Sequence, residues 1–146
     1  MRRVVDGDTI QLTTGVMVRY IGLDAPEVRR REEGRWVEDL EPFAREATQA
    51  NRRLVEGRTL TLEYDVQRQD RFGRTLAYAY VEGVMVNEAL LHQGWGRVLL
   101  IPPDLKYAAR LRAASEDARR HRRGLWNDSV CRALYGAAPC EALGKR

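Results

Sequence analysis

The sequence contains little lysine, so its positive charge comes almost entirely from arginine. Lys106 and Lys145 are the only lysines, and the formal net charge at pH 7 is +4. Arginine presents a planar guanidinium that can bind an anion through two hydrogen bonds, which favours an anionic partner. A bias in nucleotide composition or a selection for stability explains the same preference, so the arginine content alone assigns no function.

Cysteine is also scarce, and its arrangement argues against a zinc site. Cys131 and Cys140 are the only cysteines, and neither a histidine nor a further cysteine accompanies them. They form either a disulfide that closes a loop in the C-terminal tail or a pair of reduced thiols. The even number favours the disulfide, which would place the chain in an oxidising compartment.

Long hydrophobic runs and internal linkers are absent. The longest apolar run, Gly96 to Pro103, is far shorter than the ~20 residues needed to span a bilayer. No repeat, low-complexity tract or Pro/Gly-rich linker divides the 146 residues. With 44% hydrophobic and 32% charged residues, the composition is typical of one soluble domain with a core and no membrane partner.

The N-terminus carries no recognisable signal peptide. Met1-Arg2-Arg3 leads directly into the strand-like pair Val4-Val5, although a strand normally has a longer lead-in. We therefore expect that a preceding segment has been trimmed. The expected location is outside the cell or in the cell envelope, and the cytoplasm is the alternative.

Alternation of apolar and polar residues predicts a hairpin near the N-terminus. Residues 4–12 form the first strand, interrupted at Asp6-Gly7-Asp8, and residues 16–23 return. Gly22 indicates a bend or bulge in the second strand. Pro26 then ends the strand in an extended corner that exposes carbonyl oxygens, and residues 28–40 are expected to be a mobile loop.

The remainder of the chain reads as short strands followed by helices. The predicted strands cover 59–64, 76–81 and 84–86, and the predicted helices cover 41–57, 88–93 and 104–123. Asn87 and Asp104 are the expected N-caps of the last two helices. Because no βαβ alternation is present, we expect an α+β fold, a five-stranded Greek-key β-barrel with three flanking helices.

Two aspartates flank the first hairpin and are candidates for binding a cation. Antiparallel pairing can bring Asp8 and Asp24 together. Two carboxylates, a main-chain carbonyl and water form an all-oxygen site, which suits Ca²⁺ or Mg²⁺ rather than zinc. Ca²⁺ is favoured because it tolerates the irregular geometry of a bent corner. Taken alone, Asp6-Gly7-Asp8 would be read as an ordinary turn.

Three further charged residues have the chemistry of phosphodiester cleavage. Glu27 follows Asp24 by three residues and can orient or deprotonate a water, although a solvated loop glutamate is the alternative. Arg19 and Arg74 can stabilise the negative charge that builds on phosphate oxygens. A structural salt bridge is the alternative for Arg19, and a surface charge is the alternative for Arg74.

Several segments resemble the staphylococcal nuclease (thermonuclease) family. They are 5–10, 19–27, 70–78, 86–90 and the signature Gly124-Leu125-Trp126. The resemblance implies a five-stranded OB-type barrel with three helices over residues 1–126, followed by a tail over 127–146. It also implies a monomeric, Ca²⁺-dependent endonuclease that cuts DNA and RNA and leaves 5′-hydroxyl and 3′-phosphate ends. Mg²⁺ and Mn²⁺ are second choices.

The resemblance also implies roles for individual residues. The metal ligands would be the carboxylates of Asp8 and Asp24 and the carbonyl of Ala25. Glu27 would be the general base. Arg19 and Arg74 would bind the phosphate, with Arg74 also placed to assist the leaving group.

Some positions depart from the family pattern, mostly where bases would bind. Ala25 stands where the family prototype has threonine, Phe72 where it has tyrosine, and Leu100 and Pro102 where it has base-stacking tyrosines. We expect Phe72 and Trp36 to supply the stacking surface instead. Buried packing is the alternative for Phe72.

Two other functions are alternatives to a nuclease. A non-catalytic module that binds nucleic acid or protein would resemble the nuclease-like repeats of Tudor-containing scaffold proteins, which typically lack the acidic and arginine residues present here. Phosphotransfer or lipid phosphodiesterase chemistry shares the same phosphate chemistry but has no further support in the sequence.

Overall fold

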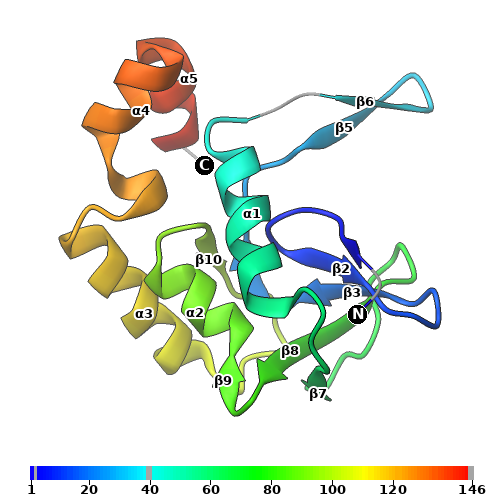
Figure 1. Cartoon of the computed structure of the whole chain (residues 1–146). Coiled ribbons are helices and arrows are strands. Elements are labelled where there is room, and N and C mark those ends of the chain that lie inside the picture. Colours follow the sequence, from blue (N-terminus) through cyan, green and yellow to red (C-terminus); the bar gives the residue numbers. More distant parts are fainter. Residues whose placement is uncertain (2, 39–40, 145–146) are drawn as a thin grey trace.

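The computed structural model describes residues 1, 3–38 and 41–144. Figure 1 shows the strands beside helices α1, α2 and α3, with α4 and α5 stacked near the N-terminal end of α1. The described helices are α1 (Ala44–Val55), α2 (Val86–His92), α3 (Ala108–Arg120), α4 (Asp128–Tyr135) and α5 (Ala137–Gly144), with a 3₁₀ turn, η1, at Gly124–Trp126. None of the described helices combines the length and the apolar character that crossing a membrane requires.

The strands form one large sheet and two separate pairs. The described strands are β1 (Arg3–Val4), β2 (Thr9–Gln11), β3 (Met17–Tyr20), β4 (Gly22–Asp24), β5 (Arg29–Glu32), β6 (Arg35–Glu38), β7 (Thr61–Glu63), β8 (Thr75–Val81), β9 (Val84–Met85) and β10 (Arg97–Leu99). The large sheet has the order β1-β2-β3-β8-β7, with β9 added to β8, while β10 pairs with β4 and β5 pairs with β6. Only β3 and β8 pair in parallel among the described strands, since α1 and β7 intervene in the chain.

The α+β class is confirmed, and the helix count differs from the prediction. Among the described residues, the strand pairs do not close into a barrel. Five α-helices are described instead of three, because the tail folds as α4 and α5. The last two residues of the predicted tail, Lys145 and Arg146, lie outside the described residues.

The predicted loop over 28–40 was wrong for most of its length. Residues 29–32 and 35–38 pair as the hairpin β5–β6, while 39–40 lie outside the described residues. Glu33 and Gly34 both have positive φ, 48° and 77°, as a two-residue hairpin turn of the primed type requires. The charged strands carry no apolar alternation, so their pattern gave no strand signal.

Two predicted helix caps were also wrong, because both side chains satisfy distant backbone groups. Asn87 is fully buried within α2; it donates to the carbonyls of Ile21 and Ala77 and accepts from the N–H of Ala79. Asp104 precedes α3, whose N-cap position is Tyr107 without a side-chain capping bond, and Oδ1 of Asp104 accepts from the N–H of Gln67 at 2.7 Å. Both side chains therefore form tertiary hydrogen bonds and do not cap a helix.

The main core fixes the turn that carries Asp8. Tyr20 donates to Asn51 Oδ1 at 2.7 Å, and Asn51 in turn donates to the carbonyl of Asp6 at 2.9 Å. A Cβ on Gly7 would lie 2.7 Å from the Cβ of Ala25 and 2.9 Å from that of Ala47. Only glycine fits this close approach, so α1 holds the Asp6-Gly7-Asp8 turn against the corner at Ala25.

Candidate active site

Arg19 on β3 lies between two carboxylates. Its Nη2 is 3.4 Å from Oδ2 of Asp8 and 3.7 Å from Oδ1 of Asp24. Thr9 is the register partner of Arg19 in the β2–β3 hairpin, which places Asp8 at the start of β2 beside β3. Asp24 lies beyond this hairpin, on β4, and the same Arg19 nitrogen contacts one carboxylate oxygen of Asp8 and one of Asp24.

The other terminal nitrogen of Arg19 is also engaged. Its Nη1 donates to the carbonyl of Tyr20 at 2.9 Å and to the carbonyl of Leu23. The side chain is only 14% exposed, so these contacts compensate a largely buried charge. The structural salt bridge considered for Arg19 is therefore present, and the same guanidinium faces the pocket described below.

Asp8 is buried and held by several donors. Oδ1 accepts from the Thr9 hydroxyl at 2.8 Å, and Oδ2 accepts from the N–H of Ala25 at 2.9 Å. The N–H of Asp8 donates to Oδ1 of Asp6 at 2.9 Å. Asp8 is therefore a fixed acceptor whose second oxygen is tied to the corner at Ala25.

Asp6 belongs to this group and was not a predicted site residue. Burial, together with the neighbouring charge of Asp8, raises the pKa of Asp6 well above its ordinary value. The two carboxylates are two residues apart in one tight turn, so the charge of Asp8 disfavours a second negative charge on Asp6. The Asp6-Gly7-Asp8 spacing could have indicated this pair, but the sequence gave no sign that the turn is buried.

The corner after β4 positions Glu27, the last acidic residue of the predicted site. Ala25 and Pro26 are buried, whereas Glu27 is exposed. The N–H of Glu27 donates to Oε1 of Glu41 at 2.8 Å, and the carbonyl of Glu27 accepts from the N–H of Glu41 at 3.0 Å. The backbone of Glu27 is thus clamped to the segment just before α1.

Asp70 organises the turn that carries Arg74. Its Oδ1 accepts from the N–H groups of Phe72 and Arg74, and its Oδ2 pairs with Nε of Arg74 at 2.7 Å. The carbons at the centres of the Arg71 and Arg74 guanidinium groups lie 4.8 and 5.4 Å from the centre of the Phe72 ring. Phe72 is 68% exposed, which rules out the alternative of buried packing for this ring.

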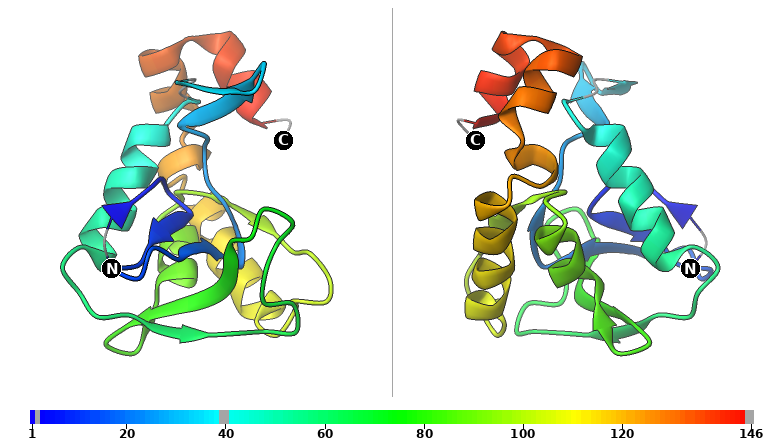
Figure 2. Two further views of the ribbon diagram at one scale, coloured as in Figure 1. Left: turned by 90° about the vertical axis from the view of Figure 1, so that its right-hand side faces the viewer. Right: turned by 60° about the vertical axis from the view of Figure 1, so that its left-hand side comes forward.

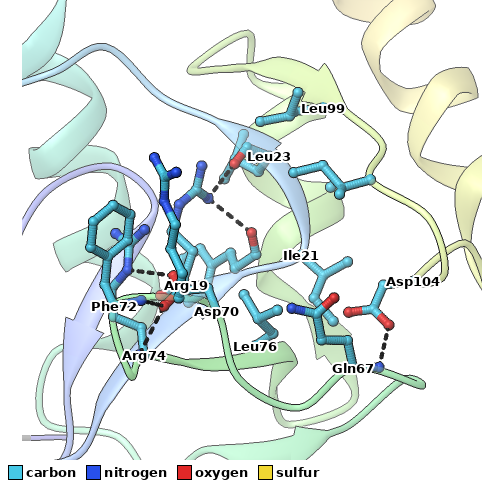
Figure 3. Close-up of a pocket in the computed structure, with 14 residues that line it drawn as sticks. Arg19, Ile21, Leu23, Gln67, Asp70, Phe72, Arg74, Leu76, Leu99 and Asp104 are labelled. Atoms are coloured by element: carbon cyan, nitrogen blue, oxygen red, sulfur yellow. Dashed lines mark hydrogen bonds and ion pairs between the residues drawn. The ribbon is translucent and has the colours of Figure 1, made fainter.

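One pocket of about 370 Å³ brings Arg19, Phe72 and Arg74 together (Figure 3). Aliphatic side chains form much of its wall, including Leu99 and Ile101. Asp8 and Asp24 do not line this pocket themselves. Both contact Arg19, which does line it. Trp36 lies on β6, opposite Arg31 in the β5–β6 hairpin, and its stacking role stays a prediction.

The oxygen donors of this site fit a hard cation. Among the described residues, no group of three or more His, Cys, Asp or Glu side chains is arranged to hold a metal ion. Asp8 and Asp24 instead offer two carboxylates beside a backbone corner, a donor set that suits Ca²⁺ or Mg²⁺ completed by water. In this structure both carboxylates face the positive charge of Arg19.

Comparisons with known proteins agree on one family. The sequence profile of the family described as staphylococcal nuclease homologue matches residues 17–128. A thermonuclease of Staphylococcus hyicus is 33% identical over 129 residues, covering 86% of this chain and 73% of that protein.

Two proteins of Bacillus subtilis are also similar. The SPbeta prophage-derived endonuclease YokF is 35% identical over 130 residues, covering 86% of this chain and 42% of that protein. The endonuclease YncB is 34% identical over 132 residues, covering 87% of this chain and 60% of that protein. The chain therefore spans less than two thirds of the length of either Bacillus protein.

Proposed function

Because the chain belongs to the staphylococcal nuclease family, we propose that it is a metal-dependent endonuclease that hydrolyses DNA and RNA. One observation carries the proposal: the guanidinium of Arg19 links the Asp8–Asp24 carboxylates to a pocket that Arg74 also lines. Carboxylates for a cation and guanidinium groups for a phosphate thus meet at one site. This combination is what phosphodiester hydrolysis requires.

Ca²⁺ is the proposed cofactor, held by the carboxylates of Asp8 and Asp24 and the carbonyl of Ala25. The hydrogen bonds that fix Asp8 support this assignment, because a ligand held in place loses little freedom when it binds. When bound, the ion supplies positive charge beside the phosphate. Mg²⁺ and Mn²⁺ are the second choices.

Arg19 and Arg74 are the proposed phosphate-binding residues. Both line the pocket, and Asp70 orients the guanidinium of Arg74 through Nε. As the phosphodiester is attacked, negative charge grows on its non-bridging oxygens, and fixed guanidinium groups stabilise it. Arg74 also assists departure of the 5′ oxygen.

Glu27 is the proposed general base. It takes a proton from a water whose oxygen attacks phosphorus, the bond from phosphorus to the 5′ oxygen breaks, and that oxygen takes up a proton from a solvent water to leave as a hydroxyl. The products would then carry 3′-phosphate and 5′-hydroxyl ends. Exposure of Glu27 and the clamp on its backbone support the role, because the side chain can reach solvent from a fixed position.

Phe72 and Trp36 are the proposed surfaces on which bases stack. Phe72 is exposed at the pocket and is flanked by Arg71 and Arg74, so a base can stack on the ring while the arginines approach its phosphate. The aliphatic wall at Leu99 and Ile101 offers no hydrogen bonds from its side chains to base edges. Weak base preference is therefore expected.

The remaining proposals concern the fold, the oligomeric state and the location of the protein. We infer that residues 1–126 correspond to the five-stranded Greek-key OB-type barrel of the family, that the tail over 127–146 is an addition to it, and that the protein acts as a monomer. The proposed location is extracellular or in the cell envelope, since the Cys131–Cys140 disulfide suits an oxidising compartment. The cytoplasm is the alternative.

The test is incubation of the purified protein with plasmid DNA and with RNA, in Ca²⁺, in Mg²⁺ and in excess chelator. The expected result is cleavage of both substrates in Ca²⁺ and none in chelator. Absence of cleavage with every divalent ion would overturn the proposal. Salt-sensitive DNA binding without cleavage would favour the non-catalytic binding module instead.

A further inference from the structure

The C-terminal tail packs against the segment that leads into α1. Cys131 on α4 and Cys140 on α5 form a disulfide, and nearly all of both helices lies beyond the residues that match the family profile. A second hydrophobic core, here called the tail core, consists of the buried residues Phe43, Leu125, Cys131, Cys140 and Leu143. Both views of Figure 2 show α4 and α5 beside the N-terminal end of α1.

Phe43 packs in the tail core and is one of the contacts between the tail and the rest of the domain. Its side chain is 3% exposed, and its ring centre lies 5.3 Å from Tyr135 in an edge-to-face contact and 6.0 Å from Trp95. The backbone of Phe43 has φ 67°, in the left-handed region that bulky residues rarely adopt. Such a conformation persists only where the surroundings enforce it, and the tail core supplies that enforcement.

The segment held by Phe43 is the one clamped to Glu27. Glu41, two residues before Phe43, bonds to Glu27 in both directions: its N–H donates to the Glu27 carbonyl, and its Oε1 accepts from the Glu27 N–H. The carbonyl of Glu41 also accepts from the N–H of Ala44 at the start of α1. A displacement of Phe43 is therefore transmitted through Glu41 to the backbone of Glu27.

The tail has two further attachments that keep it in place. The Tyr135 hydroxyl lies 3.2 Å from both carboxylate oxygens of Glu46 on α1. Arg97 on β10 donates from Nη2 to the carbonyl of Leu143 near the end of α5. The disulfide joins α4 to α5, so its loss would loosen the tail core. None of the tail-core residues lines the pocket, so the pocket itself would stay unchanged.

We propose that the disulfide-closed tail positions Glu27, with Phe43 and Tyr135 as positioning residues that act through Glu41. The proposal rests on the proposed function, because Glu27 is the proposed general base. A base held in one place spends more of its time aligned with the attacking water, whereas a mobile base does not. Opening the disulfide is therefore expected to lower kcat and to leave KM nearly unchanged.

The test compares three forms of the full chain: oxidised wild type, wild type reduced by dithiothreitol, and Cys131→Ser/Cys140→Ser. The dithiol converts the disulfide to two thiols and is itself oxidised to a disulfide. Two quantities are measured well below the unfolding temperature: hydrogen exchange at the amide of Glu27, and kcat and KM on single-stranded DNA. Leu134→Ala, at an exposed position on α4, is the matched control.

The expected result is faster exchange at Glu27 and a kcat lower by about tenfold in both forms that lack the disulfide. Dithiothreitol should change the wild type and leave the double-serine variant unaffected. Tyr135→Leu should reproduce the loss with the disulfide intact. Tyr135→Phe should retain most of the kcat, because it keeps the ring that contacts Phe43 and loses only the hydroxyl contact with Glu46.

Unchanged exchange at Glu27 or unchanged kcat after loss of the disulfide would overturn the positioning role. Equal losses in Tyr135→Phe and Tyr135→Leu would overturn the role of the ring contact. If the oxidised wild type cleaves no substrate, the proposed function fails on its own. The exchange measurement then still decides whether the tail holds the Glu27 backbone.

Discussion

Nη2 of Arg19 and Oδ2 of Asp8 lie 3.4 Å apart, and both side chains are largely buried. Asp8 is fixed by hydrogen bonds from Thr9 and Ala25, and Arg19 lines the pocket. The ion pair therefore connects a fixed part of the fold to the candidate active site. Removing one partner of a buried pair leaves an uncompensated charge. Arg19 is therefore expected to matter for stability as well as for activity.

Arg19→Met should lower the free energy of unfolding by about 3–5 kcal/mol, because Asp8 and Asp24 lose a shared positive partner in a poorly solvated place. Urea denaturation followed by circular dichroism measures the change. Arg112→Met, at an exposed position on α3, is the control and should change it little. A stability equal to that of the wild type would mean that water or another cation compensates the carboxylates.

Arg74→Ala separates catalysis from stability more cleanly, because Arg74 is partly exposed and its ion pair with Asp70 is local, four residues apart. Loss of one guanidinium that stabilises charge in the transition state should cost about 3–4 kcal/mol of barrier, which lowers kcat by ~10²–10³. Single-turnover cleavage of an oligonucleotide measures the rate, and circular dichroism checks the fold. A rate close to that of the wild type would remove Arg74 from the mechanism.

Asp24→Asn should weaken Ca²⁺ binding by about tenfold or more, since one of two carboxylate ligands loses its charge. Isothermal calorimetry on the folded variant measures the affinity. Asp128→Asn, which removes an exposed carboxylate paired with Arg132, is the control. Calcium affinity that is unchanged in Asp24→Asn would place the ion elsewhere.

Glu63 should make folding stability depend on pH in the acid range. The hydrogen bond from Lys106, with those from Tyr107 and Tyr80, lowers the pKa of Glu63 from its ordinary value of 4.5. A lowered pKa means that the contribution of Glu63 is fully present above pH 4.5 and is lost as the pH falls through the pKa of the folded state.

The measurement is urea denaturation of the wild type and of Glu63→Gln at pH 7 and at steps below pH 4.5. The wild type should be more stable at pH 7, and the difference between the two proteins should shrink as the pH falls. Glu116→Gln, at an exposed position on α3, is the control. A difference that stays constant with pH would show that the carboxylate charge contributes nothing there.

The sequence was sufficient to predict the parts of the fold that depend on local patterns. The first hairpin, α1 and the strand over 75–81 follow from alternation, helical spacing and turn residues, and the structure contains all three. The hairpin also places Asp8 beside Tyr20 of β3, whereas Asp24 lies beyond the hairpin on β4 and meets Asp8 through their shared contact with Arg19.

The parts that the sequence did not predict depend on contacts between distant residues. Asn87 resembles a helix cap in sequence, yet it bonds to Ile21, 66 positions away. The raised pKa of Asp6 depends on burial by α1, and the tail core depends on Phe43 meeting Cys131 and Cys140. Local patterns carry no information about such partners. The sequence therefore predicted the disulfide of the tail, which the structure confirms, but not the packing of the tail on Phe43.

The most direct test of the central claim is mass spectrometry of the products formed from a short single-stranded oligonucleotide in Ca²⁺. If the carboxylates and arginines act together on a phosphodiester, the wild type yields fragments with 3′-phosphate and 5′-hydroxyl ends, and excess chelator abolishes them. An intact oligonucleotide after incubation with Ca²⁺, Mg²⁺ and Mn²⁺ in turn would contradict the account.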